Sequence, residues 1–407
     1  MQNNIMTNLP QGWKMETLGK ILSSDKYSIK RGPFGSALKK SFFVEKGIRI
    51  FEQYNPINND PHWKRYFISH EKFQELEAFK ATEGDLLISC SGTLGKIVEL
   101  PKDTEMGIIN QALLKIRLNN IKILNSYFIY YFNSPIMQEK ILESTLGSTI
   151  KNIASVKILK QIEIPLPPLK KQERIVGILD ESFAKIDESI KILEQNLLNL
   201  DELMQSALQK AFNPLKDNAK ENYKLPQSWE WKSLEEISEN ISAGGDKPKN
   251  CTESKTAKNQ IPVYANGVNN NGLVGYTDKA TIIKPSLTIS ARGTIGFVCI
   301  RKEPYFPIVR LISLIPCENI LCLHYLYFCL NFFIAKGEGS SIPQLTIPKF
   351  KSLQIPLPPL KEQEQIAKHL DFVFEKTKAL KELYTKELKD YEELKQSLLN
   401  KAFKGKL

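Results

Sequence analysis

The chain has 407 residues, of which 42% are hydrophobic and 25% are charged. This length predicts two or three domains, and the composition is ordinary for a soluble globular protein. The formal net charge is +11, of which residues 1–164 hold +6 and residues 225–355 hold +4. Two basic bodies joined by nearly neutral segments favour a protein that binds a polyanion at two places. A basic protein without a nucleic-acid role explains the charge alone equally well.

The cysteine and histidine pattern argues against a metal site. Five of the six cysteines lie after residue 250, no Cys-x-x-Cys pair occurs, and the four histidines are scattered. Buried free thiols in a reducing cytosol are therefore predicted, and a structural zinc site is not. The N-terminus lacks the pattern of a signal peptide, and the most apolar stretch, residues 320–335, is too short for a bilayer. We expect a cytoplasmic protein with no membrane contact, in which this stretch forms a buried helix.

Short segments recur in the two bodies and predict a duplicated chain. Leu9-Pro10-Gln11-Gly12-Trp13 returns as Leu225-Pro226-Gln227-Ser228-Trp229, 216 residues later, and an expected strand and short helix follow each copy. Further along, Ser-Cys-Ser-Gly-Thr-Leu-Gly at residues 89–95 is similar to Ser-Ala-Arg-Gly-Thr-Ile-Gly at residues 290–296. The order body, helix, body, helix therefore indicates a tandem repeat.

The bodies are predicted to be mixed α/β domains. Residues 84–89 and 96–100 are expected strands on either side of a glycine-rich turn, and residues 113–118 alternate like a half-buried strand. Residues 127–132 and 325–333 are expected to form aromatic helices in the two cores.

A proline-rich segment precedes each predicted long helix. Ile164-Pro165-Leu166-Pro167-Pro168-Leu169 returns as Ile355-Pro356-Leu357-Pro358-Pro359-Leu360, 191 residues later. Proline fixes φ and disfavours helix in the residue before it, so the chain enters each helix extended. The first helix is expected from about Lys170 to Phe212, and the second ends at Phe403, again at an offset of 191. This constant offset predicts helices of equal length.

Both helices carry a heptad pattern, which predicts that each packs along a partner helix. Since the second body begins where the first helix ends, the chain must turn back, and we expect the helices to be antiparallel. The expected apolar positions of the first helix are Phe183, Ile186, Ile190, Leu193, Leu197, Leu200, Met204, Ala207 and Ala211. Those of the second are less regular and favour a defined register: Phe374, Thr377, Leu380, Tyr384, Leu388, Tyr391, Leu394, Leu398 and Ala402.

The predicted architecture is two globular α/β domains separated by two long antiparallel coiled-coil helices, with an internal pseudo-twofold repeat. The expected boundaries are a first domain at 1–164, a helix at 165–212, a linker at 213–224, a second domain at 225–355 and a helix at 356–407.

The sequence contains no recognisable catalytic constellation. Gly92-Thr93-Leu94-Gly95-Lys96 is too short for a phosphate-binding P-loop, and its counterpart in the second body lacks the lysine. A turn between strands is the better interpretation. Asp60-Pro61-His62-Trp63 lacks the second proline of the tetrapeptide found in amino-methyltransferases. We therefore expect no covalent chemistry from this chain.

Basic and amide-rich loops are the candidate contacts with DNA. The loop at residues 30–40 places four cations around a Gly-Pro-Phe-Gly turn, and these can bind phosphates. Asparagines in residues 266–272 can pair with adenine, although asparagine equally suits a turn with positive φ. Arg292 and Arg301 could reach guanine or phosphate, or lie on a solvated face. The candidate DNA-binding residues are Lys30, Arg31, Lys39, Lys40, Lys64, Arg65, Lys151, Asn152, Lys247, Lys249, Asn266, Asn269, Asn270, Asn271, Arg292 and Gln344.

Together, the repeated proline-rich helix entries, the Leu-Pro-x-x-Trp openings, the Gly-Pro-Phe-Gly-Ser segment and the paired glycine turns resemble the specificity subunits of type I restriction-modification enzymes. The resemblance covers essentially the whole chain. It implies two target recognition domains, each of which reads one half of a bipartite, asymmetric site in double-stranded DNA. It also implies that the helices set the spacer between the half-sites and dock two modification (methyltransferase) subunits, which motor-nuclease restriction subunits join. S-adenosylmethionine, ATP and magnesium would then bind to those partners.

Two alternatives stay open at this point. The chain could be an assembly scaffold in which the coiled coil is the working part and both bodies bind proteins. It could also be a methyltransferase in its own right, although the motifs for that activity are missing. Sequence-specific DNA protection with a modification partner separates the first alternative from DNA recognition.

Overall fold

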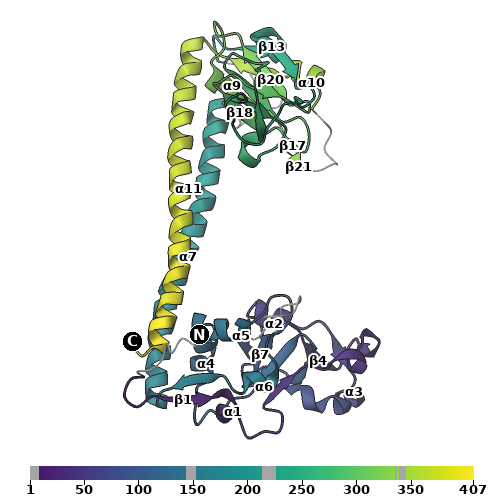
Figure 1. Cartoon of the computed structure of the whole chain (residues 1–407), viewed down its shortest axis with the longest axis vertical. Coiled ribbons are helices and arrows are strands. Elements are labelled where there is room, and N and C mark those ends of the chain that lie inside the picture. Colours follow the sequence, from purple (N-terminus) through teal and green to yellow (C-terminus); the bar gives the residue numbers. More distant parts are fainter. Residues whose placement is uncertain (1–8, 144–152, 213–225, 335–336, 339–344) are drawn as a thin grey trace. The chain divides into compact units, whose positions relative to one another are not determined.

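The structure is a computed structural model, and it describes residues 9–143, 153–212, 226–334, 337–338 and 345–407. It divides into two compact units. Unit 1 consists of Met1–Leu193 with Lys386–Leu407, and unit 2 consists of Glu194–Thr385. Each unit contains one α/β body and a part of each of the two long helices (Figure 1).

Unit 1 contains a four-stranded and a five-stranded sheet. The four-stranded sheet is antiparallel, in the order β2 (Ile29–Arg31), β10 (Leu113–Ile116), β7 (Leu86–Ser89) and β8 (Ile97–Glu99). The five-stranded sheet has the order β3 (Phe43–Val44), β5 (Phe67–Ile68), β4 (Ile48–Phe51), β9 (Gly107–Ile109) and β6 (Lys80–Ala81), and β4 and β9 run parallel. The helices of this body are α1 (Leu18–Ile21), α2 (Tyr54–Ile57), α3 (His70–Glu75), α4 (Asn125–Phe132), α5 (Pro135–Glu143) and α6 (Val156–Leu159).

Unit 2 repeats this arrangement with fewer strands. Its four-stranded antiparallel sheet has the order β13 (Ser238–Ala243), β20 (Ile312–Pro316), β16 (Ser286–Ile289) and β18 (Val298–Arg301). A three-stranded sheet has the order β15 (Leu273–Thr277), β14 (Ile261–Tyr264) and β19 (Phe306–Pro307), and β14 and β19 run parallel. The remaining elements of this body are α8 (Leu234–Ile237), β17 (Thr294–Ile295), α9 (Leu323–Phe333), β21 (Gly337–Glu338) and α10 (Ile347–Lys351). The matched strand orders confirm the predicted repeat of mixed α/β bodies.

The four-stranded sheet of unit 1 is covered on both faces. Leu114 and Ile116 of β10 belong to the apolar cluster that contains α4, whereas Leu113 belongs to a second cluster with Phe51 and Ile109 of the five-stranded sheet. All four residues of β10 are therefore buried. The prediction that residues 113–118 form a half-buried strand was wrong, because alternating sequence does not reveal a second layer.

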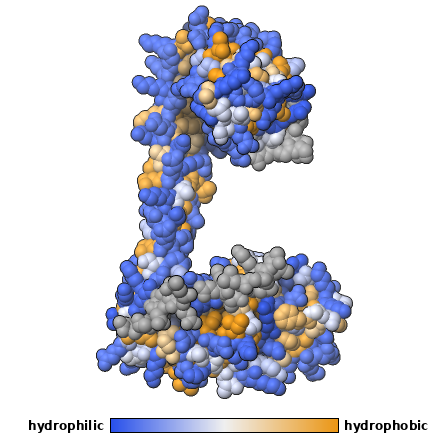
Figure 2. All heavy atoms as spheres, viewed as in Figure 1, coloured by the Kyte–Doolittle hydropathy of each residue, from blue (hydrophilic) through white to orange (hydrophobic). Residues whose placement is uncertain are grey.

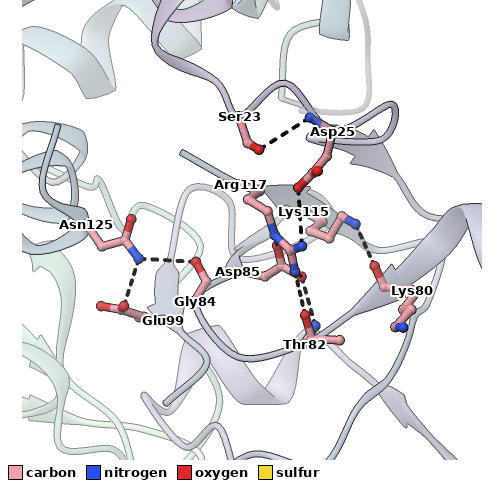
Figure 3. Close-up of polar contacts among 10 residues, drawn as sticks. All are labelled: Ser23, Asp25, Lys80, Thr82, Gly84, Asp85, Glu99, Lys115, Arg117 and Asn125. Carbon is pink, nitrogen blue, oxygen red and sulfur yellow. Dashed lines mark hydrogen bonds and ion pairs between the residues drawn. The ribbon is translucent and has the colours of Figure 1, made fainter. Parts of the chain in front are cut away.

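Lys115 is a charged residue in this buried strand, with 6% of its surface exposed. Its Nζ donates a hydrogen bond to the carbonyl oxygen of Lys80 at 2.6 Å. Just beyond the strand, Arg117 donates from Nε and Nη2 to the two carboxylate oxygens of Asp85, at 2.8 and 2.9 Å (Figure 3). Burial lowers the pKa of Lys115, and the nearby Asp85 opposes that shift. These paired charges have a structural role, since a buried charge without its partner is costly.

Each long helix follows a strand that the proline-rich segment forms. In unit 1, β11 (Glu163–Leu166) pairs antiparallel with β1 (Lys14–Thr17), and in unit 2, β22 (Gln354–Leu357) pairs antiparallel with β12 (Glu230–Ser233). The repeated Leu-Pro-x-x-Trp openings thus lead into the strands that pair with the repeated proline segments. The helices themselves, α7 (Leu169–Phe212) and α11 (Leu360–Phe403), both have 44 residues, which confirms their predicted equal length.

The two long helices are antiparallel within each unit. In unit 1, Lys395 of α11 pairs with Asp187 of α7 at 2.5 Å, and in unit 2, Lys381 pairs with Asp201. The start of α7 and the end of α11 share one apolar cluster in unit 1, and the end of α7 and the start of α11 share another in unit 2, as antiparallel helices require. All nine predicted seam positions of α7 are buried or half-buried, as expected.

The seam of α11 differs from the prediction at two positions. Leu380 and Leu394 are 38% and 44% exposed, whereas the side chains of Lys381 and Lys395 are only 29% and 17% exposed. With these lysines in the seam, the spacing becomes a regular alternation of three and four residues. Lysine can fill such a position because its aliphatic stem covers apolar surface while its charge reaches a partner.

The cysteines are all free, as predicted, but only Cys90 and Cys329 are buried, and the other four are half-buried. Burial raises the pKa of the Cys90 thiol to about 11. No helix in the described part of the chain has both the length and the apolar character to cross a membrane.

Candidate nucleic-acid interface

Four loops of unit 1 converge next to the carboxyl ends of β2, β4, β7 and β9. They comprise residues 32–40, 52–53, 90–95 and 110–112, and together they form the unit 1 loop cluster. Backbone hydrogen bonds connect these loops to one another and to adjacent strand ends: Gly32 N–H to the Leu113 oxygen at 2.9 Å, Cys90 N–H to the Ala112 oxygen at 2.8 Å, and Asn110 N–H to the Phe51 oxygen at 2.9 Å. Gly32 also has no room for a side chain, because a Cβ there would lie 1.8 Å from the Asn110 oxygen.

Unit 2 builds an equivalent cluster from the loops after β13, β14, β16 and β19. This unit 2 loop cluster comprises residues 244–250, 265–272, 290–296 and 308–310. The matching backbone bonds run from Gly244 N–H to the Leu311 oxygen and from Ile308 N–H to the Tyr264 oxygen, both at 2.8 Å. The two bodies therefore present the same four loops on the same scaffold with different side chains.

The predicted cations of the first basic loop do not all lie together. Lys39 and Lys40 are exposed, and Arg31 lies 5.5 Å from the ring of Phe34, which is 66% exposed. Lys30 instead lies over the rings of Tyr27 and Phe79, at 5.4 and 5.1 Å. Adjacent strand residues point to opposite faces, so Lys30 and Arg31 serve different surfaces. The exposed cations of this loop are therefore Lys39 and Lys40, whereas Arg31 is half-buried.

Lys64 and Arg65 lie in the segment between α2 and β5. Lys64 pairs with Glu105 at 2.9 Å, so the positive charge of Lys64 is partly neutralised within the fold. Arg65 is exposed and lies 4.7 Å from the ring of Tyr66. Burial raises the pKa of Glu52 in the loop after β4, and the nearby Arg65 opposes this shift. Arg65 is thus the member of this pair that lies near the loop cluster.

In unit 2, Lys247 and Lys249 are exposed on the loop after β13, and Asn269, Asn270 and Asn271 are exposed on the loop after β14. Asn270 and Asn271 have φ values of 49° and 52°, so the positive-φ interpretation of the asparagines is confirmed for these two. Their exposed amides stay available to a ligand.

Asn266 has both polar atoms engaged within the fold. Its Oδ1 accepts from the Ala291 N–H at 2.8 Å, and its Nδ2 donates to the Val309 oxygen at 2.6 Å. The side chain therefore links three loops of the unit 2 cluster, and a base contact would require it to give up these bonds.

The two arginines considered for unit 2 differ. Arg292 is exposed on the turn after β16. Arg301 is only 8% exposed, which makes the expectation of a DNA contact or a solvated position wrong. Its guanidinium lies 3.6 Å from the Tyr264 ring and donates to the Asn271 oxygen at 2.6 Å. Arg301 thus stabilises the loop that contains Asn271 through this hydrogen bond.

Lys151, Asn152 and Gln344 lie outside the described residues. Sequence reasoning also missed Val309 and Arg310, which are exposed in the unit 2 cluster at positive φ. Valine and arginine rarely adopt positive φ, so no local sequence pattern could have identified Val309 and Arg310. Among the described residues, no group of three or more His, Cys, Asp or Glu could hold a metal ion.

The second site that the repeat defines is the helix entry, residues 165–172 and 356–363. Gln172 is fully buried, accepts from the Leu124 N–H at 2.9 Å, and donates to the Lys122 and Pro167 oxygens at 3.0 and 2.9 Å. Gln363 makes the same three bonds in unit 2, with Cys322, Ile320 and Pro358. These glutamines fix the start of α4 or α9 to the proline turn. Gln172 and Gln363 occupy the same position in the repeated proline-rich segment, and this recurrence in the sequence could have identified them as structurally important.

A family model described as the type I restriction modification DNA specificity domain matches residues 10–198 and 226–390. Over 221 residues, the chain is 33% identical to a Mycoplasma pneumoniae protein named as a type I specificity subunit. That alignment covers 53% of this chain and 56% of the relative, so the chain matches little more than half of that relative's length. It is also 22% identical to the EcoBI specificity subunit of Escherichia coli over 359 residues, covering 79% of this chain and 73% of that one.

Solved structures resemble the fold over nearly the whole chain. A chain from a structure concerned with complex assembly and conformational transition of the type I restriction-modification system has a TM-score of 0.80 at 20% identity, covering 98% of this chain and all of that one. The HsdS subunit from Thermoanaerobacter tengcongensis has a TM-score of 0.62 at 20% identity, and 98% of each chain is covered. These similarities concern the fold alone.

Proposed function

This chain belongs to the type I restriction-modification DNA specificity family, and from that premise we propose that each of its two bodies reads one half of a bipartite, asymmetric site in double-stranded DNA. One observation carries the proposal most directly. The two bodies present equivalent loop clusters on matched sheets, but the exposed side chains differ, with Lys39 and Lys40 in unit 1 and Lys247, Lys249 and asparagines in unit 2. Equivalent placement suits a shared ligand, and different side chains suit different base sequences.

The long helices are proposed to fix the spacer between the half-sites and to dock two modification subunits. Their equal length and paired register support the first role. Exposed apolar side chains along the helices, visible as orange patches in Figure 2, support the second, because surface apolar groups favour protein contacts. The most exposed large apolar side chains of the two helices are Ile192, Leu198, Leu203, Phe372 and Leu383, which are between 51% and 59% exposed.

The chain is proposed to act in the cytoplasm as a non-catalytic subunit. Family relatives are specificity subunits, and the loop clusters contain cations and amides suited to binding. Motor-nuclease restriction subunits would complete the assembly. S-adenosylmethionine, ATP and magnesium would bind to the modification and restriction subunits rather than to this chain.

Methylation-aware sequencing of DNA from cells that express the chain with its modification subunits tests the proposal. We expect methylation at one bipartite site, with two unlike half-sites and a spacer of fixed length. Replacing residues 265–272 with an unrelated loop should change one half-site and leave the other intact. Formation of the complex without any sequence-specific methylation would instead favour the scaffold alternative.

A further inference from the structure

The turn at residues 308–311 of unit 2 has a strained backbone. Its two central residues, Val309 and Arg310, have φ values of 51° and 58°. The turn is closed by a hydrogen bond from the Leu311 N–H to the Ile308 oxygen at 3.1 Å. Turns with two positive φ values normally contain asparagine or glycine, and a β-branched residue such as valine is a marked outlier there.

Unit 1 makes the equivalent turn without this strain. Residues 110–113 follow β9 as residues 308–311 follow β19, and the Leu113 N–H donates to the Asn110 oxygen at the same 3.1 Å. Gln111 and Ala112, the central residues, do not belong to the positive-φ residues of the described chain. The topology therefore does not require the strained form. Strain that the fold does not require is typical of functional sites.

The Val309–Arg310 turn is held by hydrogen bonds from two other loops. The Val309 N–H donates to the Gly245 oxygen at 2.8 Å, and the Arg310 N–H donates to the Gly244 oxygen at 2.9 Å. The Asn266 amide donates to the Val309 oxygen at 2.6 Å. A Cβ at Gly244 would lie 2.6 Å from backbone atoms of the turn region, so the loops are tightly packed. Arg310 consequently projects from a rigid support.

The Arg310 side chain itself is exposed and unengaged. Within the described part of the chain, its guanidinium has no hydrogen-bond or ion-pair partner. Exposed Asn269, Asn270 and Asn271 occupy another loop of the same cluster. A planar guanidinium on a rigid backbone suits bidentate recognition of guanine O6 and N7 in the major groove, whereas a phosphate contact requires no such rigidity.

We propose that Arg310 is a specificity-determining residue that reads one guanine in the half-site bound by unit 2. This inference rests on the proposed function and assigns the recognised base type at one position. The bond from the Asn266 amide to the Val309 oxygen supports the turn that carries Arg310.

The test uses the full chain in complex with its modification subunits. Binding is measured on duplexes that carry the methylated site sequence and on duplexes that change one base pair at a time. Arg310→Ala and Arg310→Lys are compared with wild type, and Lys302→Ala is the matched control because Lys302 is an exposed cation outside the loop cluster. Circular dichroism melting verifies that each variant is folded.

Both Arg310 variants should lose about 5- to 150-fold in affinity for the wild-type site, the range for one good bidentate base contact. They should no longer distinguish base pairs at one G·C position of one half-site, and the other half-site should be unaffected. Wild-type discrimination by Arg310→Lys, no effect of Arg310→Ala, or an equal loss on every duplex with a flatter salt dependence would each overturn the inference. An absence of sequence preference in the wild-type complex would instead refute the proposed function.

Discussion

Phe403, the last residue of α11, packs edge to face against Tyr127 of α4, with ring centroids 5.4 Å apart. The Tyr127 hydroxyl in turn donates to the Pro165 oxygen at 2.8 Å, so Tyr127 connects the end of one long helix to the entry of the other. Phe212 repeats this relationship in unit 2, at 5.5 Å from Tyr325. In each unit, the aromatic residue that ends one helix therefore stabilises the start of its partner.

Phe403→Ala should lower the free energy of unfolding by about 3–5 kcal/mol, the usual effect of removing a fully buried aromatic ring. The same change at Phe212, which is 2% exposed, should have a similar effect. Urea denaturation measures both. Phe372→Ala is the control, since Phe372 is 59% exposed and should change stability by no more than about 0.5 kcal/mol. A loss below about 1 kcal/mol for Phe403→Ala would contradict this account.

Gln172→Leu should destabilise the helix entry of unit 1. The substitution leaves the Leu124 N–H and two carbonyl oxygens without their side-chain partner, and each buried group left unpaired costs about 1–3 kcal/mol. Gln195→Leu is the matched control, because Gln195 is an exposed glutamine on the same helix. Equal melting temperatures for the two variants would show that the buried bonds contribute nothing.

The long helices and the helix entries could be predicted from the sequence because their signals are local. Proline restricts the backbone conformation of the residue before it, and a heptad pattern can be recognised in the sequence of one helix without its partner. The position of Lys381 and Lys395 in the α11 seam could not be predicted, because hydrophobicity favours the adjacent leucines and the deciding partners, Asp201 and Asp187, lie on the other helix. Composition alone also favours an exposed Arg301, and only the tertiary contact with Tyr264 explains its burial.

The combined change Lys381→Leu and Lys395→Leu should stabilise the helix pair and weaken its register. Polar residues at core positions of a coiled coil specify register at a cost in stability. Replacing the lysines with leucine should raise the free energy of unfolding by roughly 1 kcal/mol per site, at the low end for replaced ion pairs because both aspartates are exposed. The variant should also methylate sites with altered spacers. Lys389→Leu is the control, as its side chain is 76% exposed. Reduced stability of the double variant would refute the assignment of these lysines to the seam.

The combined change Lys39→Ala and Lys40→Ala should weaken DNA binding and flatten its salt dependence. Each lost phosphate contact reduces the slope of log affinity against log salt by about 1. Titrations of the complex at several salt concentrations measure both quantities. Lys46→Ala is a suitable control because Lys46 is an exposed cation outside the loop cluster. If affinity and slope stay at wild-type values, these lysines do not lie in the interface.

Helix length should determine the DNA spacer. In unit 1, the pair Asp187–Lys395 marks opposed positions of α7 and α11. Inserting one heptad at each of these positions preserves the seam and adds about 10.5 Å to each helix, which corresponds to roughly three base pairs. Methylation-aware sequencing should then reveal a spacer longer by that amount between unchanged half-sites. Four residues inserted into α7 alone shift the seam, and this variant should lose methylation. An unchanged spacer after the paired insertion would exclude the helices as its determinant.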